Sequence, residues 1–355
     1  MSNLPSTAHF GSDNVTGIAP EIMAALEAAN NGGVASYGED AMTESLNARF
    51  SDLFETTCRV MPAGTGSIAN GLALATVTPP WGAIFCHEAA HIAVDEANGP
   101  EFLTGGAKLH LMSGDQGRVS AETLRAAASR YSRDDVHHPL PSAVSITQAT
   151  EAGTLYSVDQ IGAIGDVAKA EQLAFHLDGA RFANAVAALG CAPADLTWRA
   201  GVDLLSFGAT KNGCMAVEAI VLFNPSPEHV GRLARLHKRA GQLYSKMRFF
   251  SAQLEAYISN DNWLNWAGHA NTQAARLAAG LADVPGVSLD NPVEANEVFC
   301  RLPQGSYDAI VAAGIGTYPL SDNGDGTGSI RFVCSFNTQA EDVDKLIGAA
   351  REGAA

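Results

Sequence analysis

The sequence predicts an α/β fold, with a mostly parallel sheet of seven strands covered by helices on both faces. Three observations support this prediction. Short apolar runs alternate with alanine- and leucine-rich stretches of helical period through the first two thirds of the chain. The pattern then becomes mostly helical, and 355 residues exceed what one hydrophobic core usually holds. We therefore place a large domain, including an N-terminal segment, at residues 1–250 and a smaller α+β domain at 251–355.

The individual elements follow from local patterns. Residues 20–30 and 40–54 have the apolar spacing of amphipathic helices, and a proline stands at the start of the first. Seven apolar runs predict the strands of the large sheet, at 59–63, 83–88, 108–112, 143–147, 173–177, 203–207 and 219–223. We further predict a helical region at 231–281, strands at 298–302 and 329–336, and a turn at 321–329 between these two strands.

Composition excludes several classes of function. Apolar residues make up 46% of the chain and charged residues 17%, as expected of a compact protein with a large core. The net charge of −16 lacks the basic footprint of a nucleic-acid binder and disfavours an anionic membrane surface. We expect no secretory signal and no membrane span, because no suitable apolar run occurs. Six scattered cysteines without a C-x-x-C pair predict reduced thiols in a cytoplasmic protein.

Small residues follow the first predicted strand, in the stretch PAGTGSIANGLALA that begins at Pro62. Gly64, Thr65 and Gly66 would leave backbone N–H groups at a helix N-terminus free to face an anion, which favours a phosphate. Their spacing matches neither G-x-G-x-x-G nor a Walker loop, and an ordinary strand-to-helix turn is the alternative.

Charged residues stand at the ends of two other buried runs. Asp178 follows LAFHL, where it could cap a helix or meet a cationic ring nitrogen, as the pyridine of pyridoxal phosphate requires. Lys211, in SFGATKNG, could be a turn lysine beside an Asn-Gly pair or a Schiff-base lysine. The order of glycine loop, aspartate and lysine along the chain favours a cofactor site, because ligands bind beyond the carboxyl ends of such strands.

A competing motif is HEAAH, from His87 to His91, which matches the zinc-protease pattern H-E-x-x-H with Glu88 as base. It follows directly on a strand-like run instead of lying within a long helix, and no third ligand stands out, although Asp95, Glu96 and Glu101 are near. We therefore predict no metal site. The stretch SDNGDG, at 321–326, is expected to be a hairpin turn and not a calcium loop.

Eight segments together carry a resemblance to a known family. They run in order over nearly the whole chain: SDNVTG, YGED, PAGTGSIANGLAL, CHEAAHIAVDEANGPEF, SITQATEAGTLY, FHLDGARFANA, SFGATKNG and RFVCSF. The chain resembles the low-specificity L-threonine aldolases, and most closely the branch that acts on L-phenylserine. The resemblance implies the aspartate-aminotransferase-like fold of pyridoxal-phosphate enzymes. It also implies reversible cleavage of phenylserine, threonine or allo-threonine to glycine and an aldehyde.

The resemblance further implies which residues hold the cofactor, namely Gly64, Thr65, Gly66, His91, Asp178, Arg181, Lys211 and Arg248. Lys211 would form the Schiff base, Asp178 would face the pyridinium nitrogen, and His91 would stack on the ring, whereas His87 matches no functional position. Arg248 would reach the phosphate of a neighbouring subunit, so a homo-oligomer is expected, either a dimer or a dimer of dimers.

Substrate contacts are implied in the same way, at Ser12, Tyr37, Glu151, Arg181 and Arg331. Ser12, Arg181 and Arg331 would hold the substrate carboxylate. Lys238 corresponds loosely to a lysine contributed across the subunit interface. Glu151 stands where many threonine aldolases have a histidine near the substrate side chain.

The base that accepts the proton of the β-hydroxyl has two candidates, His91 and Glu151. We prefer His91 because an imidazole titrates near neutrality without help. In the threonine aldolases that the chain resembles, an aromatic residue stands four positions after this histidine. Asp95 stands there in this chain, which bears on how the substrate side chain is bound. A β-elimination or a transamination on the same scaffold is the first alternative. More distant ones are a zinc hydrolase using His87, Glu88 and His91, and a binding protein without catalysis.

Overall fold

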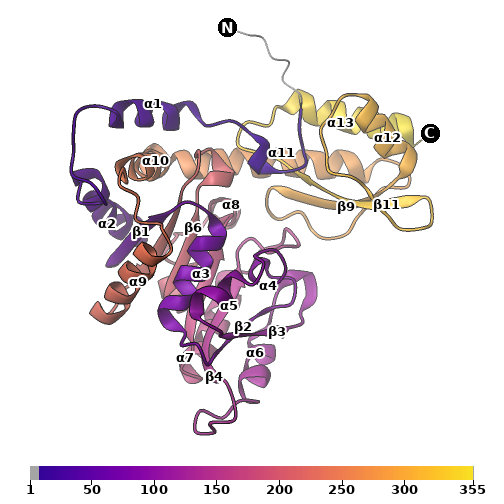
Figure 1. The fold of residues 1–355 in the computed structure, drawn as a ribbon. Helices are drawn as coiled ribbons and strands as arrows, with labels where there is room; N and C mark the ends of the chain where they lie inside the picture. The colour runs from indigo at the N-terminus through magenta and orange to yellow at the C-terminus, as the bar shows by residue number, and fades with distance from the viewer. Residues whose placement is uncertain (1–7, 355) are drawn as a thin grey trace.

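All seven predicted strands form in the computed structural model, which describes residues 8–354 (Figure 1). The first residues of the predicted N-terminal segment, 1–7, lie outside the described residues. The strands are β1 Cys58–Ala63, β2 Gly82–His87, β3 Lys108–Met112, β4 Leu140–Thr147, β5 Ala174–Gly179, β6 Leu204–Gly208 and β7 Glu218–Phe223. They lie in one sheet in the order β1-β7-β6-β5-β4-β2-β3. The pairs β2–β3, β2–β4, β4–β5 and β5–β6 are parallel, which confirms the predicted mostly parallel sheet.

Strand β7 is the exception, because it runs antiparallel to both β6 and β1. The connection between β6 and β7 spans only 209–217, which leaves no room for the crossover helix that a parallel pair requires. As a result, the first residue of β7, Glu218, lies at the same edge of the sheet as the carboxyl ends of the parallel strands.

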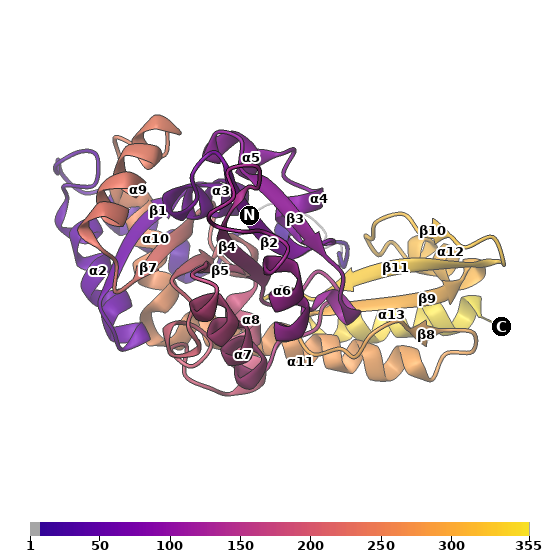
Figure 2. The same cartoon turned by 90° about the horizontal axis from the view of Figure 1, so that it is seen from below.

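Helices cover both faces of this sheet (Figure 2). In chain order they are α1 Pro20–Ala29, α2 Ala41–Phe54, α3 Gly66–Val77, α4 His91–Val94, α5 Gly99–Thr104, α6 Ala121–Ala128, α7 Val158–Ala170, α8 Phe182–Leu189, α9 Pro227–Arg239 and α10 Arg248–Ile258. Apolar side chains of α2, α7 and α8 pack in the main core on one face, whereas those of α3 and α9 fill a second core on the other. The strands are therefore buried between two layers of helices, except for the edge strand β3, which is partly exposed.

The small domain packs three helices against one face of a four-stranded antiparallel sheet. Its helices are α11 Asn262–Ala282, α12 Gln304–Ala312 and α13 Ala340–Gly353, and its strands are β8 Ser288–Leu289, β9 Glu297–Pro303, β10 Ser321–Asp322 and β11 Thr327–Val333. Strands β10 and β11 form a hairpin, so the predicted hairpin turn at 321–326 is confirmed.

The two cores divide later than the predicted boundary at residue 250. Trp263 and Ala267 of α11 belong to the core of the large domain, whereas Ala274 and Leu277 of the same helix belong to the small one. The chain thus passes between the domains inside one unbroken helix, where no loop or change of pattern marks the transition. Phe10 also joins the small core, and its backbone bonds Val333 at 2.7 Å.

Helix α7 offers a matched pair of glycines that tests its packing against the 3-10 turn Trp198–Ala200. A Cβ on Gly165 would meet the carbonyl oxygen of Ala200 at 2.1 Å, whereas a Cβ on Gly162 would meet nothing within 4 Å. Gly165→Ala should therefore lower the free energy of unfolding by about 1–3 kcal/mol. Gly162→Ala, the control, should raise it by up to about 1 kcal/mol through helix propensity. The shift of the urea midpoint measures both, and equal effects would contradict the close approach.

Surface and thiol properties agree with the composition. Among residues 8–354, no helix combines the length and the apolar character needed to cross a bilayer. All six cysteines are free, and burial raises the pKa of the thiols of Cys58, Cys86, Cys300 and Cys334 to about 12. These thiols are therefore protonated packing groups at neutral pH and not nucleophiles.

Candidate functional site

A cavity of about 300 Å³ opens at the carboxyl ends of the parallel strands. Its lining comes from the segments that directly follow β1, β2, β4, β5 and β6, which the topology brings to one edge. Eight of the residues predicted from the sequence line it: Gly64, Thr65, Gly66, His91, Glu151, Asp178, Arg181 and Lys211. The structure thus brings together predicted residues that are as far apart in the sequence as Gly64 and Lys211, 147 positions.

Lys211 lies in a single 3-10 turn, Thr210–Asn212, directly after β6. The turn is fixed from behind, because the Asn212 side chain donates to the Tyr257 hydroxyl at 2.8 Å and to the Trp263 carbonyl at 2.9 Å. Gly213 then adopts a φ of 104°, which favours glycine. The Asn-Gly pair is therefore a buried anchor and not an exposed hairpin turn. Among the described residues, the Lys211 amine has no hydrogen-bond or ion-pair partner.

Asp178 is the penultimate residue of β5, and its side chain is almost fully buried. One carboxylate oxygen accepts the Ala180 N–H at 3.0 Å, and the other accepts the Asn70 amide at 2.7 Å. Helix α8 begins at Phe182 without a side-chain cap, so the helix-cap alternative for Asp178 is wrong. The carboxylate is instead one wall of the cavity.

The glycine segment leads into the N-terminus of α3, a helix of 12 residues. The Thr65 side chain caps this helix by accepting the Ile68 N–H at 3.3 Å. A Cβ on Gly66 would meet nothing within 4 Å, so the space in front of this helix end is open. Gly64 is closely packed instead, since its N–H donates to the Gln242 side chain at 2.9 Å and a Cβ would meet the Tyr244 hydroxyl at 2.6 Å.

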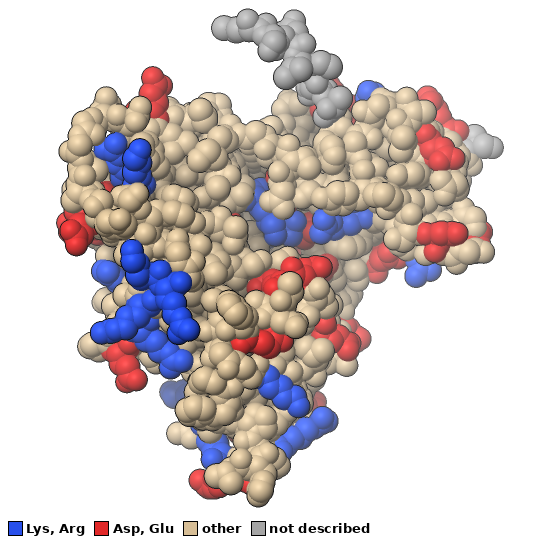
Figure 3. Space-filling view, in the orientation of Figure 1, with Lys and Arg blue, Asp and Glu red and all other residues tan. Residues whose placement is uncertain are grey.

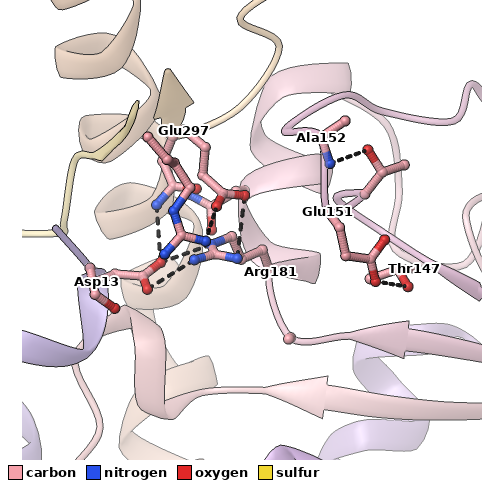
Figure 4. Close-up of polar contacts among 12 residues, drawn as sticks. Asp13, Thr147, Glu151, Ala152, Arg181 and Glu297 are labelled. Atoms are coloured by element: carbon pink, nitrogen blue, oxygen red, sulfur yellow. Dashed lines mark hydrogen bonds and ion pairs between the residues drawn. The ribbon is translucent and has the colours of Figure 1, made fainter. Parts of the chain in front are cut away.

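His91, the first residue of α4, is bound on two sides by carboxylates. Its Nδ1 lies 2.8 Å from a carboxylate oxygen of Glu96, and its backbone N–H donates to Glu151 at 2.8 Å. The hydrogen bond to Glu96 raises the pKa of His91 above its ordinary value, although burial opposes the rise. Thr147 donates to Glu151 at 2.7 Å (Figure 4), yet burial keeps the pKa of Glu151 above its usual value.

Arg181 is held between two buried carboxylates (Figure 4). Asp13 accepts from its guanidinium at 2.9 and 3.1 Å, and Glu297 lies 3.3 Å away. Burial alone would raise the pKa of Asp13, but Arg181 holds it below its usual value. Arg331 shares Glu297 at 3.3 Å, while the hydroxyl of Ser12 is engaged by the Asn14 N–H at 3.1 Å. Arg331 and Ser12 thus lie beside the cavity and not in its lining.

Tyr37 and Arg248 do not lie in the cavity of this chain. Tyr37 is exposed, and the Lys238 ammonium lies 4.8 Å from the centre of its ring. Arg248 donates to the Gly32 carbonyl at 3.0 Å. Tyr37 thus lies beside α9, where Lys and Arg side chains gather at the surface: Arg232, Arg235, Lys238 and Arg239 (Figure 3).

The H-E-x-x-H motif does not form a metal site. His87 ends β2 whereas His91 begins α4, so the two histidines are not on one face of a helix. The two ring nitrogens of His87 are engaged by the Gly114 carbonyl and the Ala89 N–H, both at 3.0 Å. Among residues 8–354, no group of three or more potential ligands could hold a metal ion. The geometry gives the zinc hydrolase no support.

Sequence reasoning missed five polar residues around the cavity: Asp13, Asn70, Glu96, Glu218 and Glu297. Glu218 lines the cavity because β7 is antiparallel, which the apolar run alone did not reveal. Burial raises the pKa of Glu218 to about 7, and its carboxylate accepts the Ala209 N–H at 2.7 Å. Asn70 lies one helical turn after Gly66, a spacing that could have indicated its direction.

Known proteins resemble the chain over almost its whole length. The sequence model of the beta-eliminating lyase family matches residues 9–303. A low specificity L-threonine aldolase from Pseudomonas aeruginosa is 44% identical over 340 residues, which cover 96% of each chain. Another, from Pseudomonas sp., is 42% identical over 346 residues, with 96% of each chain covered.

Solved structures give the same result for the fold. The Leishmania major threonine aldolase superimposes with a TM-score of 0.90 at 25% identity, covering 98% of this chain and 100% of its own. The alanine–glyoxylate aminotransferase from Nostoc sp. shares the fold with a TM-score of 0.69 at 16% identity, over 100% and 97% of the two chains. The predicted aminotransferase-like fold is confirmed. The chain belongs to the low-specificity L-threonine aldolases of the beta-eliminating lyase family, which are lyases that depend on pyridoxal phosphate.

Proposed function

We propose that this cavity cleaves L-threonine and other L-β-hydroxy-α-amino acids between Cα and Cβ, giving glycine and an aldehyde. One observation carries the proposal. Lys211, Asp178 and the open N-terminus of α3 converge on a single cavity at the carboxyl edge of the sheet. The threonine aldolase relatives support the same reaction, which is reversible.

The residues of the cavity fit pyridoxal phosphate. The Lys211 amine, which has no hydrogen-bond or ion-pair partner among residues 8–354, would hold the cofactor covalently. The open space in front of Gly66 and the α3 N-terminus suit its phosphate. Asp178 would keep the ring nitrogen protonated, because a buried carboxylate favours a cation beside it. When bound, the cofactor supplies an electron sink for the pair of electrons left on Cα.

The substrate carboxylate is assigned to Arg181 and Arg331, with Ser12 beside them. Asp13 and Glu297 orient the guanidinium of Arg181, and Glu297 also orients that of Arg331, which lowers the entropy lost when an anion binds. This clamp would fix Cα and so decide which of its bonds lies in line for cleavage.

His91 is assigned as the base that accepts the proton of the β-hydroxyl. Because Nδ1 faces Glu96, the neutral ring carries its proton there and leaves Nε2 free to accept another. Glu151 is the less suitable candidate, since the Oε1 of its carboxylate already accepts two hydrogen bonds, from Thr147 and His91. We assign Glu151 to the region of the substrate side chain.

The wider substrate range and the assembly belong to this proposal as well. Phenylserine and allo-threonine are expected substrates from the resemblance of the sequence, and Glu151, which we assign to the side-chain region, lines the cavity. Arg248, together with the contacting pair Tyr37 and Lys238, would complete the site of a neighbouring copy in a dimer or dimer of dimers. Their distance from the cavity of their own chain suits this role better than a direct one.

Product analysis tests the proposed reaction. The holoenzyme should convert L-threonine, L-allo-threonine and L-phenylserine to glycine and an equal amount of acetaldehyde or benzaldehyde. O-methyl-L-threonine is the matched control, because it has no hydroxyl proton for the base and should not be cleaved. A 2-oxo acid with ammonia would indicate β-elimination, and a 2-oxo acid without ammonia would indicate transamination. Either result in place of glycine would overturn the proposal.

A further inference from the structure

Two buried side chains, Glu96 and the cavity-lining Asn70, connect His91 with Asp178. Oε1 of Glu96 accepts from His91 Nδ1 at 2.8 Å and from Asn70 Nδ2 at 2.9 Å. The same Asn70 Nδ2 donates to Asp178 Oδ2 at 2.7 Å. The result is an unbroken chain of hydrogen bonds in the order His91, Glu96, Asn70 and Asp178.

The donors and acceptors in this series of hydrogen bonds allow one arrangement of protons. Both carboxylates are acceptors when ionised, so the Asn70 amide must direct its two N–H groups at them, one to each. The Glu96 side chain is fully buried and Asn70 is 2% exposed, so both groups are shielded from bulk water. Asn70 Oδ1 and Glu96 Oε2 have no partner among the described residues. An orphaned buried oxygen costs free energy, which indicates that Asn70 is held here for its two donors.

We propose that Glu96 and Asn70 are positioning residues that link the protonation of His91 to Asp178, the group opposite the cofactor ring. Glu96 orients the imidazole and stabilises its charged form after it takes up a proton. Asn70 stabilises Glu96 and Asp178 as two separate anions, although both are buried close together. This inference rests on the proposed function for the roles of His91 and Asp178, but the link itself is a property of the folded chain.

The charges around His91 set the direction of the expected pH effect. Glu96 raises the pKa of His91 through the hydrogen bond, burial lowers it, Asp178 adds to the rise and Lys211 opposes it. The carboxylate of Glu151 accepts the backbone N–H of His91. Removing the charge of Glu96 therefore lowers the pKa of His91, and its protonation midpoint moves to lower pH.

Histidine titration by NMR tests the first half of the link. In the holoenzyme with labelled histidine, the His91 signal is assigned by its loss in His91→Gln. Its midpoint should fall in Glu96→Gln and stay unchanged in Glu88→Gln, which removes an exposed carboxylate from the same segment. An unchanged midpoint in Glu96→Gln would overturn the role of Glu96.

The absorbance of the bound cofactor tests the second half, because it reports on the ring that faces Asp178. Glu96→Gln should shift the pH titration of this absorbance in the natural background but not in an Asn70→Leu background. Equal shifts in both backgrounds, or none in either, would overturn Asn70 as the link. Asn70→Ser, which keeps one donor, serves if the leucine variant does not fold. Neither readout uses a substrate, so failure of the proposed reaction would leave both results interpretable.

Discussion

Replacing Lys211 with alanine should lower kcat for threonine cleavage by more than about 10⁴-fold, because groups that act as one catalytic unit lose nearly all activity when one is removed. The Lys211 amine is the group in the cavity lining that can bond covalently to an aldehyde. Without it, the cofactor would be held only by non-covalent contacts with its phosphate and ring. The loss should therefore appear in kcat even at saturating cofactor.

The variant Lys211→Arg separates the covalent role from the charge. Arginine keeps a positive charge beside Glu218, whose pKa is raised by burial and partly lowered by Lys211. The guanidinium of the arginine stays protonated, however, and cannot attach to the cofactor. It should be as inactive as the alanine variant. Lys345→Ala, an exposed lysine on α13, is the control and should retain full activity.

Mass spectrometry provides the direct measurement for Lys211. Borohydride reduction of the natural holoenzyme should add the mass of the cofactor to the peptide that contains Lys211, and to no peptide of either variant. A labelled peptide elsewhere, or full activity in Lys211→Arg, would contradict the assignment.

The sequence predicted most of what lies directly after a strand, for a physical reason. Parallel strands bring their carboxyl ends to one edge, so Gly64, Asp178 and Lys211 could be assigned to one site once the strands were recognised, whereas His91 was assigned through the family resemblance. Each apolar run is short and bounded by turn residues, which made its end visible.

The residues that were missed depend on features that no local pattern carries. Glu218 reaches the cavity at the start of a strand, because the short connection after β6 reverses the direction of β7. Glu297 and Asp13 come from β9 and from the start of the chain, and they meet at Arg181 only through the packing of the two domains. The boundary inside α11 was missed for a related reason, since a continuous helix gives no signal of which core each turn enters.

Asp178→Asn should lower kcat by about 10²–10⁴-fold, the range that a positioned proton-holding group contributes. The amide has nearly the same shape as the carboxylate, so the fold and the contact with the Ala180 N–H can persist. It carries no charge, however, and cannot keep the ring nitrogen protonated, so electrons on Cα lose their sink. The cofactor should remain bound in part, because Lys211 and the α3 N-terminus are untouched.

The interpretation of this variant depends on Asn70, which donates to Asp178 at 2.7 Å. An amide at position 178 has one oxygen, which can accept the Ala180 N–H or the Asn70 amide but not both, so Asp178→Asn removes the negative charge and one of these two hydrogen bonds. Asp178→Ala removes the acceptor as well and should lose more cofactor, whereas Asp178→Glu restores the charge and should recover part of kcat. Cofactor occupancy from absorbance, measured beside kcat, distinguishes these effects. Near-normal kcat in Asp178→Asn would mean that the ring nitrogen needs no anionic partner, and the electron sink would then have to depend on another group.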